Sequence, residues 1–142
     1  MLCVGLAFGL TVLEPVADLA SAVTDTERAM VRLVNRSRRN HGISGLNIAP
    51  GLSGAAHRHS ARMARRGQLY HSCLTCLLNG YGVSWSIAGE NVGVGSTLRS
   101  IHRAMLGSTK HRSNILRRGY RRIAIGVVRS NGRNWVTEIF FG

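Results

Sequence analysis

The chain has 142 residues, a length that suits one domain and leaves little room for two. Apolar residues make up 44% of the chain and charged residues only 18%, so a packed core is feasible and the composition argues against wholesale disorder. The 19 Lys and Arg against 6 Asp and Glu give a net charge of +13, which favours anionic partners. Aromatic residues, at 6%, argue against a platform that stacks nucleic-acid bases.

Residues 1–22 are predicted to be a cleaved secretory signal. The apolar run Leu2–Leu13 is too short to span a bilayer comfortably as a helix, and Ala20-Ser21-Ala22 has the small-x-small pattern that signal peptidase accepts. No Lys or Arg precedes the apolar run, so an uncleaved anchor, a buried N-terminal element and a start further upstream stay open. Cleavage would remove Cys3 and leave one domain over residues 23–142, without a transmembrane span.

Two helices are predicted in the first half of that domain. Thr24-Asp25-Thr26-Glu27 is a capping-box signature, so the first helix begins there and stops near Gly42. The second helix begins near Pro50, carries its apolar residues on one stripe and closes at Gly67.

The second half of the chain changes its pattern. Residues 68–95 hold many glycines and are expected to be loop-rich, and a third helix begins at Ser96 or Thr97. Apolar residues then alternate with small ones over 123–127, and Asn131-Gly132 separates this run from another over 135–141, which predicts an antiparallel hairpin. Helices followed by a hairpin indicate an α+β protein.

Cys73 and Cys76 form a Cys-x-x-Cys pair, which can be a redox site, half of a zinc site or a tight disulfide. No second pair completes a four-cysteine zinc site, and outside the cytosol a structural disulfide is favoured. Free thiols and redox chemistry stay as alternatives. The segment 71–77 lacks the strand-then-helix context of a thioredoxin-like motif.

The few acidic residues sort into two kinds. Asp25 and Glu27 lie in the first turn of a predicted helix, where capping and the helix dipole explain them. Glu90 and Glu138 remain, and each either pairs with an arginine or does chemistry. Glu90 is the stronger functional candidate, because its glycine-rich and apolar neighbours are a poor setting for a solvated charge.

Two of the six histidines stand out. His71 and His111 lie in loop-like segments flanked by turn-forming residues, which makes them candidate metal ligands or acid–base groups. His57 and His59 point about 200° apart on a predicted helix and cannot chelate one ion, and His59 is expected to be a structural core residue. His41 and His102 carry no such signal.

Five motifs occur in a characteristic order: Leu69-Tyr70-His71-Ser72, Gly89-Glu90-Asn91-Val92, His111-Arg112-Ser113-Asn114-Ile115-Leu116, Ile125-Gly126-Val127-Val128 and Trp135-Val136-Thr137-Glu138-Ile139-Phe140. This order resembles the CAP superfamily, the SCP-domain family of cysteine-rich secretory proteins, antigen 5 and plant pathogenesis-related proteins, and is most similar to its short bacterial secreted branch. The resemblance covers roughly Thr24 to Gly142, as a single CAP/SCP domain.

The resemblance implies an α-β-α sandwich, in which a small central antiparallel sheet lies between helical layers beside a cleft. Two histidines and two acids typically line that cleft and in several members hold a divalent cation. Carried over residue by residue, they are His71, Glu90 and His111. The second acid usually lies shortly before the second histidine, where residues 104–109 hold no carboxylate, so the set is incomplete. Ser108 and Glu138, the latter where relatives commonly carry glutamine, are secondary candidates.

Such a set favours a binding module over an enzyme. Two imidazoles and one carboxylate can hold Zn²⁺ with an open position, whereas Ca²⁺ prefers six to eight oxygens. A hydrolase would also need a general base, and no free second carboxylate is evident. Binding of a cell-envelope lipid or other small ligand is therefore the favoured function, because relatives bind sterols and lipids, and a metal-dependent hydrolase is the alternative.

The arginines are expected to set location. They are spread over several predicted helices without a recognition helix or zinc finger, so specific nucleic-acid binding is not expected. We expect a secreted monomer that its charge holds near an anionic component of the cell envelope.

Overall fold

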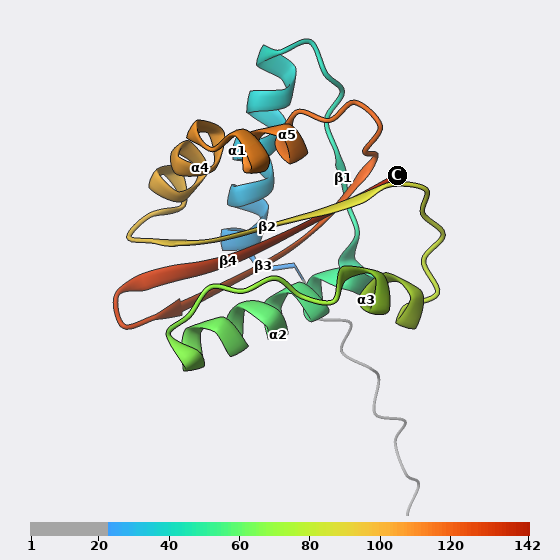
Figure 1. The fold of residues 1–142 in the computed structure, drawn as a ribbon. Coiled ribbons are helices and arrows are strands. Elements are labelled where there is room, and N and C mark those ends of the chain that lie inside the picture. Colours follow the sequence, from blue (N-terminus) through green and yellow to red (C-terminus); the bar gives the residue numbers. More distant parts are fainter. Residues whose placement is uncertain (1–22) are drawn as a thin grey trace, which may run out of the picture.

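The computed structural model describes residues 23–142, so the predicted signal sequence and Cys3 lie outside the described residues. The described part forms five helices and four strands (Figure 1). In chain order these are α1 (Asp25–Asn40), β1 (Asn47–Ile48), α2 (Pro50–Arg66), α3 (Leu74–Gly80), β2 (Ala88–Gly95), α4 (Leu98–Gly107), α5 (Thr109–Ile115), β3 (Arg122–Ser130) and β4 (Arg133–Phe141).

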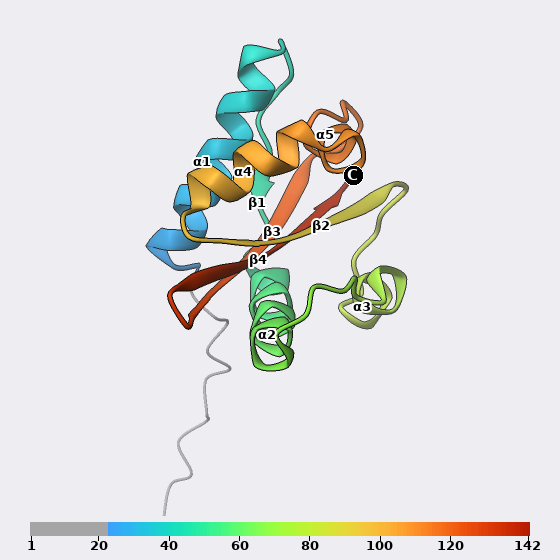
Figure 2. The same cartoon turned by 60° about the vertical axis from the view of Figure 1, so that its left-hand side comes forward.

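The four strands form one sheet in the order β1-β3-β4-β2. Helices α2 and α3 lie on one face of it and α1, α4 and α5 on the other, which Figures 1 and 2 show from two directions. The predicted α+β class and α-β-α layering are confirmed. The three long strands are antiparallel as expected, and the short β1 pairs with β3 in parallel, which makes the sheet mixed.

Both faces of β4 are buried, because helices cover the sheet from both sides. Val136 and Phe140 join the core beneath α1, α4 and α5, while Ile139 and Phe141 join the core beneath α2 and α3. Successive side chains of a strand point to opposite faces, so one strand supplies both cores. β4 is therefore the central structural element of the domain.

Local signals in the sequence placed the ends of α1 and α2 and the hairpin turn correctly. Thr24 caps α1 in a complete capping box with Glu27, and α2 begins at Pro50 and closes at Gly67 with a φ of 64°. The hairpin turn is also as predicted, since Asn131 and Gly132 have φ angles of 47° and 72°. Positive φ at both central residues suits the twist of a tight hairpin.

The expectation of a loop-rich stretch over residues 68–95 is wrong, because that stretch contains α3 and all of β2. The glycines of β2 serve close packing. A Cβ at Gly93 would lie 2.8 Å from the Cε of Met105, and a Cβ at Gly95 would lie 2.8 Å from the Cγ1 of Ile101. Glycine in a strand can mark such a close approach, which here lets α4 lie against the sheet.

Arg38 departs from the expected pattern of solvent-facing arginines. It is fully buried near the end of α1, where its guanidinium donates to the backbone carbonyls of Ser44, Ile115 and Arg117 at 2.8 to 2.9 Å. Burial is the main cause that lowers its pKa from the ordinary value. Arg38 thereby joins α1 to the segment between α5 and β3.

Within residues 23–142, no helix is long and apolar enough to cross a bilayer.

Candidate functional site

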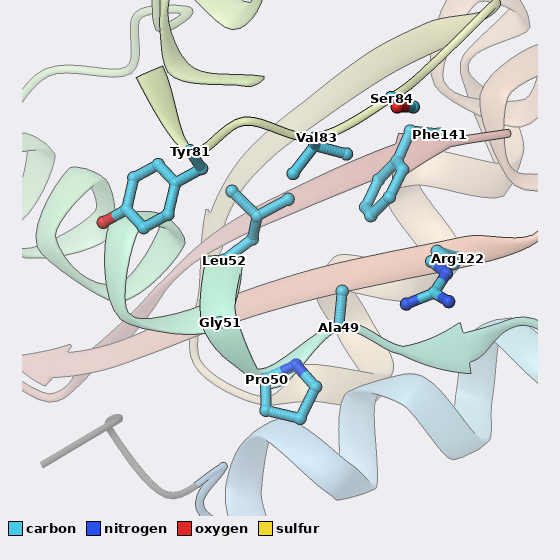
Figure 3. A pocket seen from close by; sticks show the side chains of 9 residues that line it. All are labelled: Ala49, Pro50, Gly51, Leu52, Tyr81, Val83, Ser84, Arg122 and Phe141. Carbon is cyan, nitrogen blue, oxygen red and sulfur yellow. The ribbon is translucent and has the colours of Figure 1, made fainter. Parts of the chain in front are cut away.

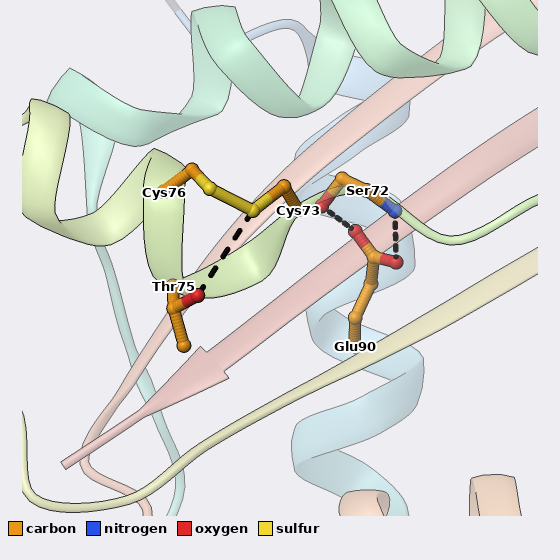
Figure 4. The surroundings of a disulfide bond; sticks show 5 residues. All are labelled: Ser72, Cys73, Thr75, Cys76 and Glu90. Atoms are coloured by element: carbon orange, nitrogen blue, oxygen red, sulfur yellow. Dashed lines mark hydrogen bonds between the residues drawn. A yellow bond between two sulfur atoms is a disulfide. The ribbon is translucent and has the colours of Figure 1, made fainter.

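Glu90 holds the first part of the site together. Its Oε1 accepts the backbone N–H of Ser72 at 2.9 Å and Nδ1 of His71 at 2.8 Å, and its Oε2 accepts the Ser72 hydroxyl at 2.5 Å. Figure 4 shows the two contacts with Ser72. The Glu90 side chain is 4% exposed, and its partners within the described chain are these residues, not an arginine. The arginine partner that one interpretation from sequence gave to Glu90 is therefore not found among the described residues.

His71 is fixed at one nitrogen and open at the other. Its Nδ1 faces a carboxylate, so this nitrogen carries the proton, which leaves Nε2 available to accept a hydrogen bond or to bind a ligand. The His71 side chain is 61% exposed. The pair therefore presents one oriented imidazole to solvent.

His111 lies in α5, which corrects the expectation of a loop. Ser108 ends α4 and also precedes the first residue of α5, so the turn-forming residues mark the junction of two helices. Burial, and then the positive charge of nearby His71, lower the pKa of His111 below its usual value.

A groove of about 280 Å³ lies over β2, and His111 is part of its lining. Its lining is mostly apolar and comes from the segment before His71, from β2 and from α4 and α5: it includes Leu69, Val92, Val94, Met105, Ser108 and His111. Leu69 is one of two large apolar side chains that stand exposed in the described chain. An apolar groove with a few polar groups at its rim suits a small ligand.

The three predicted residues do not come together as a metal site. Among residues 23–142, no group of three His, Cys, Asp or Glu side chains is placed to hold a metal ion. Both oxygens of Glu90 are engaged by His71 and Ser72, which leaves two imidazoles as ready donors. A three-ligand zinc site with an open position therefore does not fit these side chains as they lie.

Glu138 lies beneath the site on β4 and is completely buried. Its Oε2 accepts Nδ2 of Asn91 at 2.9 Å, and its Oε1 has no hydrogen-bond partner within the described residues. Burial raises the pKa of Glu138 to about 7, although the Asn91 contact opposes the change. The arginine partner, one of the two interpretations from sequence, is not found among the described residues: an asparagine takes that place.

Asn91 connects Glu138 to the site. Its Nδ2 also lies 3.2 Å from the backbone oxygen of His111, and its Oδ1 accepts from Asn114 at 2.9 Å. Asn114 donates in addition to the backbone oxygen of Glu90 at 3.2 Å. Asn91 and Asn114 were not predicted as site residues, although each stands in one of the five motifs. Their position beside Glu90 and His111 was the available signal.

Glu27 does more than cap α1. Its Oε2 accepts the backbone N–H of Thr24, while its Oε1 lies 3.0 Å from Nδ1 of His57 and 3.2 Å from the backbone N of Val127. β1 covers only the start of β3, so this buried carboxylate satisfies an N–H farther along the β3 edge.

His59 is a buried structural residue as predicted, with Nε2 at 2.8 Å from the backbone oxygen of Tyr70.

A larger cavity of about 420 Å³ lies elsewhere, at the start of α2 (Figure 3). Leu52, Val83 and Phe141 line it, with Tyr81 and Arg122 at its margins. None of the predicted site residues contributes to it. A variant at this cavity can therefore serve as a control for a variant of the groove over β2.

Comparisons with known proteins identify the family. Residues 31–140 match CAP, the cysteine-rich secretory protein family, so the chain belongs to that family and the resemblance seen in the motif order is confirmed. An uncharacterized Bacillus subtilis protein, YkwD, is 32% identical over 128 residues, which are 86% of this chain and 49% of that protein. The chain thus spans about half the length of this relative.

Two solved structures support the fold. An extracellular Bacillus anthracis protein containing an SCP domain has a TM-score of 0.72 at 23% identity, over 82% of this chain and 40% of the other. An outer surface protein of Borrelia burgdorferi has a TM-score of 0.76 at 14% identity, over 84% of this chain and 93% of the other. At these identities the likeness establishes the shared fold.

Proposed function

We propose that this chain is a secreted CAP-domain protein whose groove over β2 binds a small apolar ligand of the cell envelope, of the lipid class. The observation that carries the proposal is a mostly apolar groove whose lining includes the imidazole of His111 and the hydroxyl of Ser108. Leu69, Val92 and Met105 provide apolar contact area for the body of a ligand. The membership of relatives among extracellular and surface proteins supports secretion.

Polar groups at the groove give the ligand an orientation. The imidazole of His111 and the Ser108 hydroxyl, both in the lining, are the groups that would receive a polar head. Pockets for small ligands typically combine apolar walls with a few such groups. The lipid chain would then lie along β2 and its head toward His111.

The charge distribution supports attachment to an anionic envelope. Three of the four carboxylate side chains in the described residues, Glu27, Glu90 and Glu138, are buried, which leaves Asp25 exposed. The surface is therefore almost purely cationic. We expect retention on an acidic polymer to fall sharply between low and high ionic strength, as measured by elution from a polyanion column. Salt-independent retention would contradict this role.

Titration with a fluorescent single-chain lipid tests the groove. Leu69→Ser removes an exposed apolar contact and should weaken binding about tenfold, since burial of a leucine contributes about 1.5–3 kcal/mol. Arg122→Gln, at the margin of the larger cavity, is the matched surface control and should leave the affinity unchanged. Absence of binding, or a loss confined to Arg122→Gln, refutes the assignment.

A divalent cation is a further part of the proposal, limited to the two imidazoles of His71 and His111. Calorimetric titration of Zn²⁺ and Ca²⁺ into metal-free protein tests it, with His71→Ala and His111→Ala as variants. We expect weak Zn²⁺ binding that either variant abolishes and no comparable Ca²⁺ binding, because imidazole suits zinc and Ca²⁺ takes oxygen ligands. Zinc binding that survives both variants would exclude this site.

A further inference from the structure

The disulfide between Cys73 and Cys76 continues directly from the residues that hold His71. Figure 4 shows the bond beside the contacts of Ser72 with Glu90. Ser72 uses both its backbone N–H and its hydroxyl for these contacts, and Cys73 follows in the chain. Any change of backbone path at Cys73 therefore reaches the Glu90–His71 pair through one peptide unit.

The disulfide fixes the first turn of α3. Cys73 is the cap residue of this helix and Cys76 lies in its first turn, with 5.3 Å between the two Cα atoms. α3 has only seven residues, too few for a helix to be stable by itself in water. Leu78 is fully buried, and Leu74 and Leu77 are half-buried against the same core, so the core holds one face of the helix while the disulfide and Ser72 constrain its start.

Both sulfur-bearing residues are exposed, unlike the members of a buried structural disulfide. An external thiolate can approach either sulfur, and accessibility is one of the factors that set the rate of exchange. The Thr75 hydroxyl lies 4.0 Å from Sγ of Cys73 and can donate to a thiolate formed there.

From these observations we propose that Cys73–Cys76 is a reversible thiol–disulfide exchange site that controls the position of His71. The thiolate of an external dithiol attacks one sulfur, the Cys73–Cys76 bond breaks, and a mixed disulfide forms. The second thiol of the dithiol then displaces the remaining protein thiolate. The protein gains two electrons and two protons as two thiols, and the dithiol becomes a disulfide.

The oxidised form keeps the Glu90–His71 pair in the observed geometry. With the bond intact, Ser72 keeps Glu90 in place and Glu90 orients His71. Reduction releases the first turn of α3, so Ser72 leaves Glu90 more often and the imidazole loses its fixed orientation. The consequence for a ligand rests on the proposed function of the groove, whereas the change at Ser72 and His71 does not.

Amide hydrogen exchange and imidazole NMR signals test the inference without any ligand. Dithiothreitol is added to folded protein, and free thiols are counted by alkylation and mass spectrometry. We expect two thiols, exchange of the Ser72 amide about tenfold faster, shifted ring signals of His71, and restoration of all three on reoxidation. The Val127 amide, which lies against the buried Glu27, is the internal control and should keep its protection.

The double variant Cys73→Ser/Cys76→Ser should show the reduced-state values with and without dithiothreitol. The inference is overturned if the folded protein resists reduction, if reduction leaves Ser72 and His71 unchanged, or if Val127 loses protection together with them. That last result would mean that the disulfide stabilises the whole domain. Failure of the oxidised protein to bind the fluorescent lipid contradicts the proposed function alone, because these readouts require no ligand.

Discussion

Replacement of Glu138 by glutamine should make the protein less sensitive to rising pH. The Glu138 carboxyl is completely buried, one of its oxygens has no partner within the described residues, and its pKa rises from an ordinary 4.5 to about 7. At ~1.4 kcal/mol per pKa unit this difference corresponds to about 3 kcal/mol. Glutamine has the same shape, keeps an acceptor for Asn91 and carries no charge.

The sign follows from proton linkage. The native state binds the Glu138 proton more tightly than the unfolded state, so this stability is fully present below about pH 4.5 and is lost as the pH rises through about 7. The glutamine variant does not lose this stability as the pH rises. Its free energy of unfolding relative to the parent should therefore improve by about 3 kcal/mol between about pH 4 and about pH 8.5.

Urea unfolding followed by tryptophan fluorescence at several pH values measures this difference. Comparison of variant with parent at each pH cancels the titration of the histidines, which both proteins share. A difference that stays constant across the range would refute the reasoning, because it would mean that Glu138 does not titrate between the two states in this window.

Three further substitutions test buried contacts elsewhere in the domain by urea unfolding. Glu27→Gln should lower the free energy of unfolding by about 1–3 kcal/mol, because it weakens buried contacts. Asp25→Asn, an exposed change in the same helical turn, should lower it by less than about 1 kcal/mol. Equal losses would argue against a buried role for Glu27. Gly126→Ala should cost at least about 2 kcal/mol, because its Cβ would overlap the backbone of α2, whereas Gly51→Ala meets nothing within 4 Å and should be tolerated. Arg38→Met should cost about 2–5 kcal/mol by leaving buried carbonyls unpaired, and a near-neutral result would show that water replaces the guanidinium.

The sequence alone determined the ends of α1 and α2 and the position of the hairpin turn, because those signals are local. A capping box at Thr24, a left-handed glycine at Gly67 and the Asn131-Gly132 turn each act over a few residues, so they can be read without the fold. The order of five motifs likewise identified the family, since motif order is itself a property of the sequence. It also selected Glu90 as the acid of interest.

Only the tertiary structure decided which groups each polar side chain meets. The sequence explained Glu27 as a helix cap, and the structure adds a contact with the backbone N–H of Val127, 100 residues away. For Glu138 an arginine partner was one interpretation, but its partner is Asn91, 47 residues away. The glycines of β2 resembled a loop because their role depends on α4, which follows later in the chain. Partners this distant are set by the packing of layers, which no local pattern encodes, and the same packing brings His71 to 2.8 Å from Glu90.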